Sequence, residues 1–141
     1  MSQRSRDLPR RSCLSIPGSS EKMVGKGPGI PADMIFLDLE DAVAPKEKEA
    51  SRGKIAHALR TLDWGDKVMC VRVNDWSTKW TAYDIIEVVG NAGPRLDEIM
   101  LPKVESAAQI VATDMLLRQV EIAAGLPIGH IGIEAQIETA R

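Results

Sequence analysis

The sequence alternates short strand-like runs with helical stretches, and the runs begin about 30 residues apart. The runs predicted as strands cover residues 12–17, 34–41, 67–74, 98–104 and 130–139. The stretches predicted as helices cover residues 19–26, 45–62, 81–91 and 106–124. Such alternation is typical of βαβ units, which place parallel strands side by side. We therefore expect an α/β fold built on a parallel sheet.

Two architectures are consistent with this alternation: an open doubly wound sheet and a (β/α)8 barrel. The first predicted strand is followed by PGSSEKMVGKGPG, which is rich in glycine. It lacks the G-x-G-x-x-G spacing of a dinucleotide-binding turn, and no Walker lysine motif is present. A barrel needs eight strands and only five are predicted, so this chain would supply its N-terminal part. We expect an arm at residues 1–11 and barrel structure over residues 12–141.

Four predicted strands carry ionisable side chains on one face, mostly toward their C-terminal ends. Alternation groups Asp38 with Glu40, Arg72 with Asn74, Lys103 with Ile99 and Leu101, and Glu134 with Gln136 and Glu138. Burying unpaired charge is costly, so these groups must be paired, metal-bound or open to solvent. In (β/α)8 barrels the active site lies at the C-terminal strand ends. The pattern favours the barrel, while a charge network that only rigidifies the lumen is the alternative.

The residue types at this edge indicate a divalent cation and an arginine. The carboxylates there, Asp38, Glu40, Asp41 and Glu138, outnumber Arg72 and Lys103. Oxygen-rich sites suit Mg²⁺ or Mn²⁺ better than zinc. His57 falls within a predicted helix and His130 at the opposite strand end, so neither supports zinc binding or a nucleophile–histidine pair. Such a site can hold an α-keto acid or stabilise an enolate.

The bulk composition excludes several other classes of protein. The 141 residues are 44% hydrophobic and 27% charged, with a net charge of -2, as in ordinary globular domains. This balance predicts no nucleic-acid or membrane partner. The N-terminal arginines precede no apolar segment of signal-peptide type, so we expect a cytoplasmic protein. Cys13 and Cys70 lie in apolar runs and are predicted to be buried, reduced thiols.

Five segments together resemble one enzyme family in order and spacing. They are RRSCLSIPGSSEKM, FLDLEDAVAP, VRVND, IMLPKVES and IEAQIETAR. This set resembles the citrate lyase β-subunit-like branch of the HpcH/HpaI aldolase superfamily, which also contains malyl-CoA lyases. The resemblance implies a (β/α)8 barrel that cleaves or forms a carbon–carbon bond beside a thioester. It also implies Mg²⁺, with Mn²⁺ as a substitute, and as substrates a CoA thioester and a small α-keto acid.

The resemblance assigns roles to four residues at the strand ends. Glu138 matches the first carboxylate ligand of the metal, and Arg72 matches the arginine that grips the substrate and stabilises the enolate oxygen. Glu40 and Asp41 match an acidic pair that acts near the metal through its waters. A second metal carboxylate and a C-terminal lid belong to family segments that lie beyond these 141 residues.

The resemblance places coenzyme A over the first βα loop. Lys22 and Lys26 match positions that meet its phosphates, and lysine replaces the commoner arginine at position 22. Ser19 and Ser20 open the following helix, whose free N–H groups would add to phosphate binding. Pro102 of IMLPKVES is implied at the substrate pocket. Solvated surface lysines are the alternative reading of Lys22 and Lys26.

Several functions remain compatible with the resemblance. The leading one is a Mg²⁺-dependent lyase acting on malyl-CoA or citramalyl-CoA. The alternatives are the citryl-lyase subunit of citrate lyase, a malyl-CoA thioesterase, and a fragment that binds a CoA ester or partner without turnover. A pyruvate-type class II aldolase usually draws on a histidine near its first strands, and none occurs there. The family suggests a homo-oligomer, a trimer or hexamer.

Overall fold

The computed structural model describes residues 7–140, so Arg4 and Arg6 of the predicted arm lie outside the described residues. Its strands are β1 (Cys13–Pro17), β2 (Met34–Asp38), β3 (Val68–Arg72), β4 (Glu98–Leu101) and β5 (Gly132–Ala135). Its α-helices are α2 (Glu21–Lys26), α3 (Lys48–Thr61), α4 (Thr81–Ala92) and α5 (Ala107–Ala123). Short 3-10 turns occupy Gly27–Gly29, Pro45–Glu47 and Gly93–Arg95.

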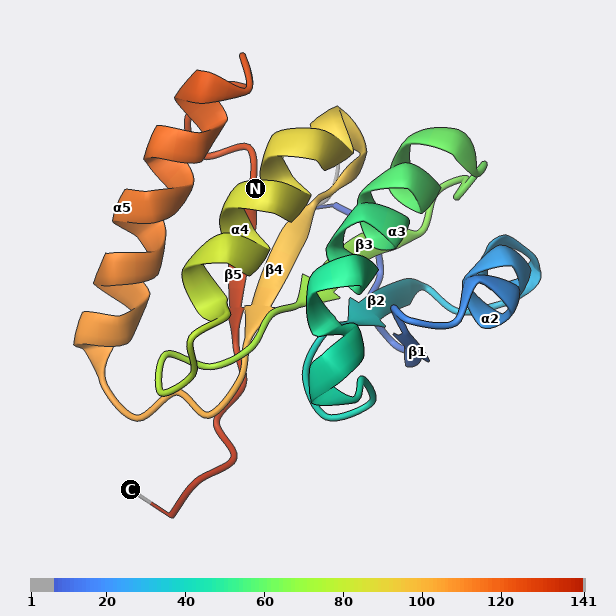
Figure 1. Cartoon of the computed structure of the whole chain (residues 1–141). Helices are drawn as coiled ribbons and strands as arrows, with labels where there is room; N and C mark the ends of the chain where they lie inside the picture. The colour runs from blue at the N-terminus through green and yellow to red at the C-terminus, as the bar shows by residue number, and fades with distance from the viewer. Residues whose placement is uncertain (1–6, 141) are drawn as a thin grey trace.

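The five strands form one parallel sheet in the order β1-β2-β3-β4-β5. Helices α3, α4 and α5 lie side by side on one face of the sheet (Figure 1). A doubly wound sheet would reverse its strand order and carry helices on both faces. Sequential order with helices on one face is instead the arrangement of consecutive βα units in a (β/α)8 barrel. The predicted fold class is confirmed, with five of the barrel's strands in this chain.

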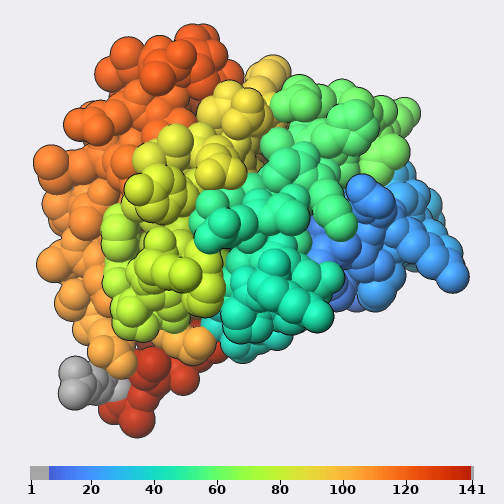
Figure 2. Space-filling model, viewed as in Figure 1, coloured from blue at the N-terminus to red at the C-terminus, as the bar shows by residue number. Residues whose placement is uncertain are grey.

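The main hydrophobic core lies between the sheet and its helices. Leu37, Val71 and Ile99, from three successive strands, are fully buried there. Ile55 of α3 and Val88 of α4 pack against them, on the apolar faces of their helices. The space-filling view shows α3, α4 and α5 packed closely across this face (Figure 2).

The opposite face of the sheet, which would face the lumen of a closed barrel, carries a smaller apolar cluster. Met34, Val68, Cys70 and Met100 are buried in it. The predicted burial of Cys70 is confirmed, whereas that of Cys13 is wrong. Cys13 is exposed because β1 is the edge of this sheet, so an apolar run in the sequence does not bury it there.

The strands end earlier than alternation in the sequence predicts. Glu40, Asn74 and Glu138 therefore lie in the loops that follow β2, β3 and β5. The placement of Lys103 on the face of Ile99 and Leu101 is also wrong, since β4 ends before it and its φ is 51°. Alternation holds only within extended backbone, so it assigns no face to residues past a strand end.

A close backbone contact fixes the first loop onto the end of β2. The N–H of Gly18 donates to the carbonyl of Asp38 at 2.8 Å. A Cβ at position 18 would lie 2.4 Å from Cδ1 of Ile55 and 2.7 Å from that carbonyl, so only glycine fits.

None of the helices formed by residues 7–140 combines the length and apolar character that a membrane span requires.

Candidate active site

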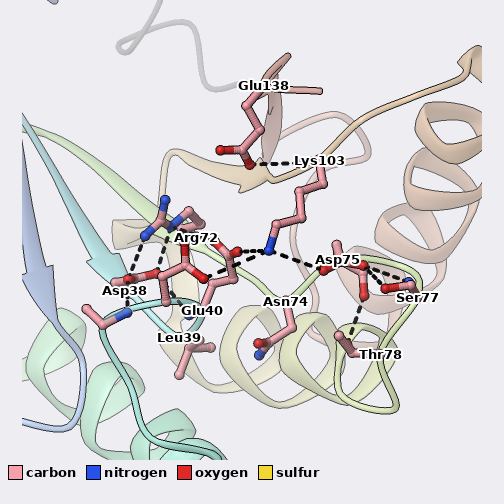
Figure 3. Close-up of polar contacts among 12 residues, drawn as sticks. Asp38, Leu39, Glu40, Arg72, Asn74, Asp75, Ser77, Thr78, Lys103 and Glu138 are labelled. Atoms are coloured by element: carbon pink, nitrogen blue, oxygen red, sulfur yellow. Dashed lines mark hydrogen bonds and ion pairs between the residues drawn. The ribbon is translucent and has the colours of Figure 1, made fainter. Parts of the chain in front are cut away.

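Arg72 and Asp38 form a two-pronged ion pair at the C-terminal ends of neighbouring strands, where the sheet register sets them opposite each other. Nε of Arg72 donates to Oδ1 of Asp38 at 2.8 Å, and Nη2 donates to Oδ2 at 2.7 Å (Figure 3). The Asp38 carboxylate is fully buried and also accepts the N–H groups of Glu40 and Ala42, each at 2.9 Å. The guanidinium lies 5.2 Å from the centre of the Phe36 ring. These contacts fix the orientation of Arg72.

Glu40 joins this pair to Lys103. Nζ of Lys103 lies 2.6 Å from Oε1 of Glu40, and Nε of Arg72 lies 3.4 Å from Oε2. The same ammonium is 3.9 Å from both Asp41 and Asp75. Among the described residues, Oε2 of Glu40 is buried without a hydrogen bond. We call the carboxylates Asp38, Glu40, Asp41 and Asp75 the acidic rim.

Lys103 also connects the rim to Glu138, through its backbone. Its N–H donates to Oε1 of Glu138 at 3.0 Å, and Figure 3 shows the carboxylate of Glu138 directed toward that amide. Lys103 is the one described residue other than glycine with a positive φ. A conformation of this kind costs about 1 kcal/mol or more and persists where surrounding contacts hold it. Its amide and its ammonium thus contact carboxylates from the loops after β2, β3 and β5.

Burial and ion pairing shift the pKa values of the rim in opposite directions. Burial would raise the pKa of Asp38, but hydrogen bonds from Arg72 and two backbone amides outweigh it and hold the value below the ordinary one. Burial raises the pKa of Glu40 despite its contacts with Lys103 and Arg72. The hydrogen bond to Glu40 raises the pKa of Lys103. Asp38 is therefore a fixed anion, while Glu40 protonates more readily.

The donor chemistry of the site fits Mg²⁺ held by few protein ligands. No three His, Cys, Asp or Glu side chains within residues 7–140 are grouped so that they could hold a metal ion. Magnesium commonly keeps several waters and takes only one or two protein carboxylates together with substrate oxygens. Glu138 is an exposed carboxylate beside the rim and can serve as such a ligand.

Arg72, Glu40 and Asp41, which the sequence placed in one site, lie together in the structure, and Lys103 links Glu138 to them. Pro102 is buried directly before Lys103. One carboxylate of the acidic rim, Asp75, was not among those that the sequence placed at this edge. Asp75 follows β3 within VRVND, where the sequence already showed polar residues past a strand.

The residues predicted to meet coenzyme A lie on α2 and the turn before it. Lys22 and Lys26 are exposed, and Ser19 is half-buried. The helix cap is Ser20, within the predicted helix start, and its Oγ accepts the N–H of Met23 at 3.3 Å. These positions are on the β1 side of the site, on the helix that follows that strand (Figure 1).

Comparison with known proteins identifies the family. Residues 11–141 match the family described as HpcH/HpaI aldolase/citrate lyase. The chain belongs to this family. It is 43% identical, over 94% of its length and 41% of the relative's, to an L-malyl-CoA/beta-methylmalyl-CoA lyase of Cereibacter sphaeroides. It is 38% identical to a citrate lyase subunit beta of Leuconostoc mesenteroides, over 93% of its length and 42% of the relative's.

A solved member of similar fold is protein CitE of Mycobacterium tuberculosis in complex with magnesium, acetoacetate and coenzyme A. Its TM-score is 0.67 at 31% identity, covering 94% of this chain and 42% of that one. The chain thus spans less than half the length of each of these relatives.

Proposed function

We propose that this chain contributes the N-terminal strands of the active site of a Mg²⁺-dependent CoA-ester lyase. The reaction is cleavage of a 3-hydroxyacyl-CoA such as malyl-CoA or citramalyl-CoA to acetyl-CoA and an α-keto acid, or its reverse. The observation that carries the proposal is the guanidinium of Arg72, which Asp38 fixes at the strand ends and which Glu40 and Lys103 connect to Glu138. The lyase relative and the solved complex with magnesium, acetoacetate and coenzyme A support it.

Arg72 acts on the charge that develops during cleavage. When the bond between C2 and C3 of the acyl group breaks, its electron pair passes to the thioester as an enolate while the 3-hydroxyl loses its proton. The enolate then takes a proton at carbon to give acetyl-CoA. A guanidinium held in advance stabilises the enolate oxygen without reorganisation. Asp38 maintains that orientation and does not itself contact substrate.

Glu138 would hold the metal, which when bound supplies Lewis-acid stabilisation of the keto-acid oxygens. Glu40 and Asp41 would act on its waters, since the ammonium of Lys103 already lies against them. Lys22, Lys26 and Ser19 would bind the phosphates of coenzyme A, and Pro102 would line the substrate pocket. We also propose that the whole protein is a cytoplasmic homo-oligomer, a trimer or hexamer.

The proposal is tested by incubating the intact natural protein with malyl-CoA and Mg²⁺ and trapping glyoxylate with phenylhydrazine. We expect cleavage that stops on chelation of the metal and in Arg72→Ala, while CoA-ester binding is retained. Arg118→Ala is the control, because Arg118 pairs only with Asp114 on the exposed side of α5 among the contacts described. Free malate without glyoxylate would instead indicate a thioesterase. Cleavage of a citryl thioester only on a carrier protein would indicate a citrate lyase subunit, and binding without turnover a non-catalytic protein.

A further inference from the structure

A buried lysine lies directly beneath the acidic rim. Lys48, the first residue of α3, is only 6% exposed. Its Nζ donates to the carbonyl oxygen of Leu39 at 2.8 Å, to that of Glu40 at 2.7 Å, and to Oδ1 of Asn74 at 2.8 Å. An ammonium has three donors, and all three are used. The Trp80 ring lies 5.2 Å from the same nitrogen.

These three acceptors come from two loops that carry the site. Leu39 and Glu40 follow β2, whose last residue is the partner of Arg72. Asn74 follows β3, next to Asp75 of the rim. The ammonium of Lys48 therefore joins the backbone that presents the Glu40 carboxylate to the loop that presents Asp75.

The contacts continue into the helical layer. The backbone N–H and Nδ2 of Asn74 donate to Oδ2 of Asp84 at 3.0 and 2.7 Å. Oδ1 of Asp84 accepts Nε of Arg52 at 2.8 Å, and Asp84 is fully buried. The amide of Asn74 is thus fixed on both sides, which gives Lys48 a rigid acceptor.

Stability alone does not explain this arrangement. Replacing a buried, fully paired charge by an apolar side chain of similar volume is often neutral or stabilising. Burial lowers the pKa of Lys48, against the opposing effect of the carboxylates of Asp38, Asp84, Glu40 and Asp41. A buried cation whose partners are mostly backbone of the site loops is better explained by the geometry that it enforces.

We propose that Lys48 is a positioning residue: it fixes the β2 and β3 loops relative to each other and so sets Glu40 and Asp75 around the ammonium of Lys103. The inference deepens the proposed lyase function and rests on it for its catalytic consequence. Lys48 reaches no substrate itself, since its three donors are occupied by the protein.

The test compares Lys48→Met with Lys46→Met in the intact natural protein; Lys46 is exposed two residues earlier. At a temperature where both are folded by circular dichroism, we expect Lys48→Met to lower kcat at least tenfold and to change KM for the CoA ester less than threefold. Amide hydrogen exchange in residues 39–42 should quicken at least tenfold in Lys48→Met and not in Lys46→Met. Unchanged exchange and kcat would overturn the inference.

The exchange measurement separates this inference from the proposed function. If the wild-type protein has no lyase activity, the function fails, and exchange in residues 39–42 still decides whether Lys48 orders the loop. If Lys48→Met does not fold, Asn74→Ala takes its place, because it removes one of the three acceptors and leaves the lysine. Exchange in residues 39–42 that matches the wild type in Asn74→Ala would then count against the inference.

Discussion

The substitution Asp38→Asn tests whether the buried carboxylate holds the site together. Oδ1 of Asp38 accepts Nε of Arg72 and the N–H of Glu40, while Oδ2 accepts Nη2 of Arg72 and the N–H of Ala42. An asparagine amide replaces one of these oxygens with an NH₂ group. In either orientation of the amide, two donors then face another donor.

The size of the effect follows from those two lost acceptors. A donor left unsatisfied in a buried site costs about 1–3 kcal/mol. Two unsatisfied donors therefore cost roughly 3 kcal/mol of unfolding free energy, which is the lower end of the cost of breaking a buried ion pair. We expect the lower end because the Arg72 guanidinium has some access to solvent. Because Arg72 loses its fixed orientation as well, we expect lyase activity to fall at least 100-fold in the intact protein.

Urea denaturation at pH 7 measures the free energy of unfolding, with Asp66→Asn as an exposed control expected within about 0.5 kcal/mol of wild type. The pKa of Asp38 is lower in the folded state than in the unfolded one. Its contribution is therefore fully present above the unfolded pKa and is lost as pH falls through the folded pKa. The gap between wild type and Asp38→Asn should accordingly narrow below about pH 4. A gap under 1 kcal/mol at pH 7, or one that does not narrow in acid, would refute this reasoning.

Three further predictions concern the metal, the thioester and the thiols. Glu138→Gln should raise the Mg²⁺ concentration needed for half-maximal activity by orders of magnitude, and an unchanged metal titration would place the metal elsewhere. Lys22→Ala should weaken CoA-ester binding by up to about 1 kcal/mol at low salt and less at high salt, as isothermal titration would show; equal loss at both would exclude a phosphate contact. Cys13 is exposed, yet desolvation, followed by the charges of Glu134 and Glu98, raises its pKa to about 11. Iodoacetamide should therefore label it slowly at pH 7 and about tenfold faster per pH unit below that value, leaving buried Cys70 unlabelled, and rapid labelling at pH 7 would contradict this pKa.

The architecture was predictable because it depends on periodicity and not on detail. In each strand, every second residue faces the helices, and the residues at those positions are apolar. Leu37 and Val71 therefore lie in the core, where this alternation places them. The strand ends were not predictable to the residue. Polar residues such as Glu40 continue the alternation past the last ladder pair, and only the hydrogen-bonding partners determine where a strand stops. The exposure of Cys13 depended on the position of β1 at the sheet edge, which no local pattern contains.

The site was predictable as a set of charges at one edge, but its connections were not. Asp38 and Arg72 occupy the last positions of neighbouring strands, and that much follows from alternation and register. Lys103 enters the site only because its backbone adopts a positive φ that contacts with Glu138 help to hold. Lys48 had the helical position of an ordinary surface lysine, so its burial could not be expected from spacing alone.

The charge arrangement of the rim bears on how a metal could use it. Arg72 already pairs with Asp38, and the ammonium of Lys103 lies among Glu40, Asp41 and Asp75. A metal ion that displaced the Lys103 ammonium from Glu40 would break the closest ion pair of the rim. Breaking that pair costs free energy, and a metal bound outside the rim avoids this cost. We therefore expect Mg²⁺ to bind at Glu138. The carboxylate of Glu138 contacts only the backbone N–H of Lys103 among the contacts described, and no side-chain cation. The rim carboxylates would then act on metal-bound water and on the orientation of Arg72, so their substitution should lower kcat more than metal affinity.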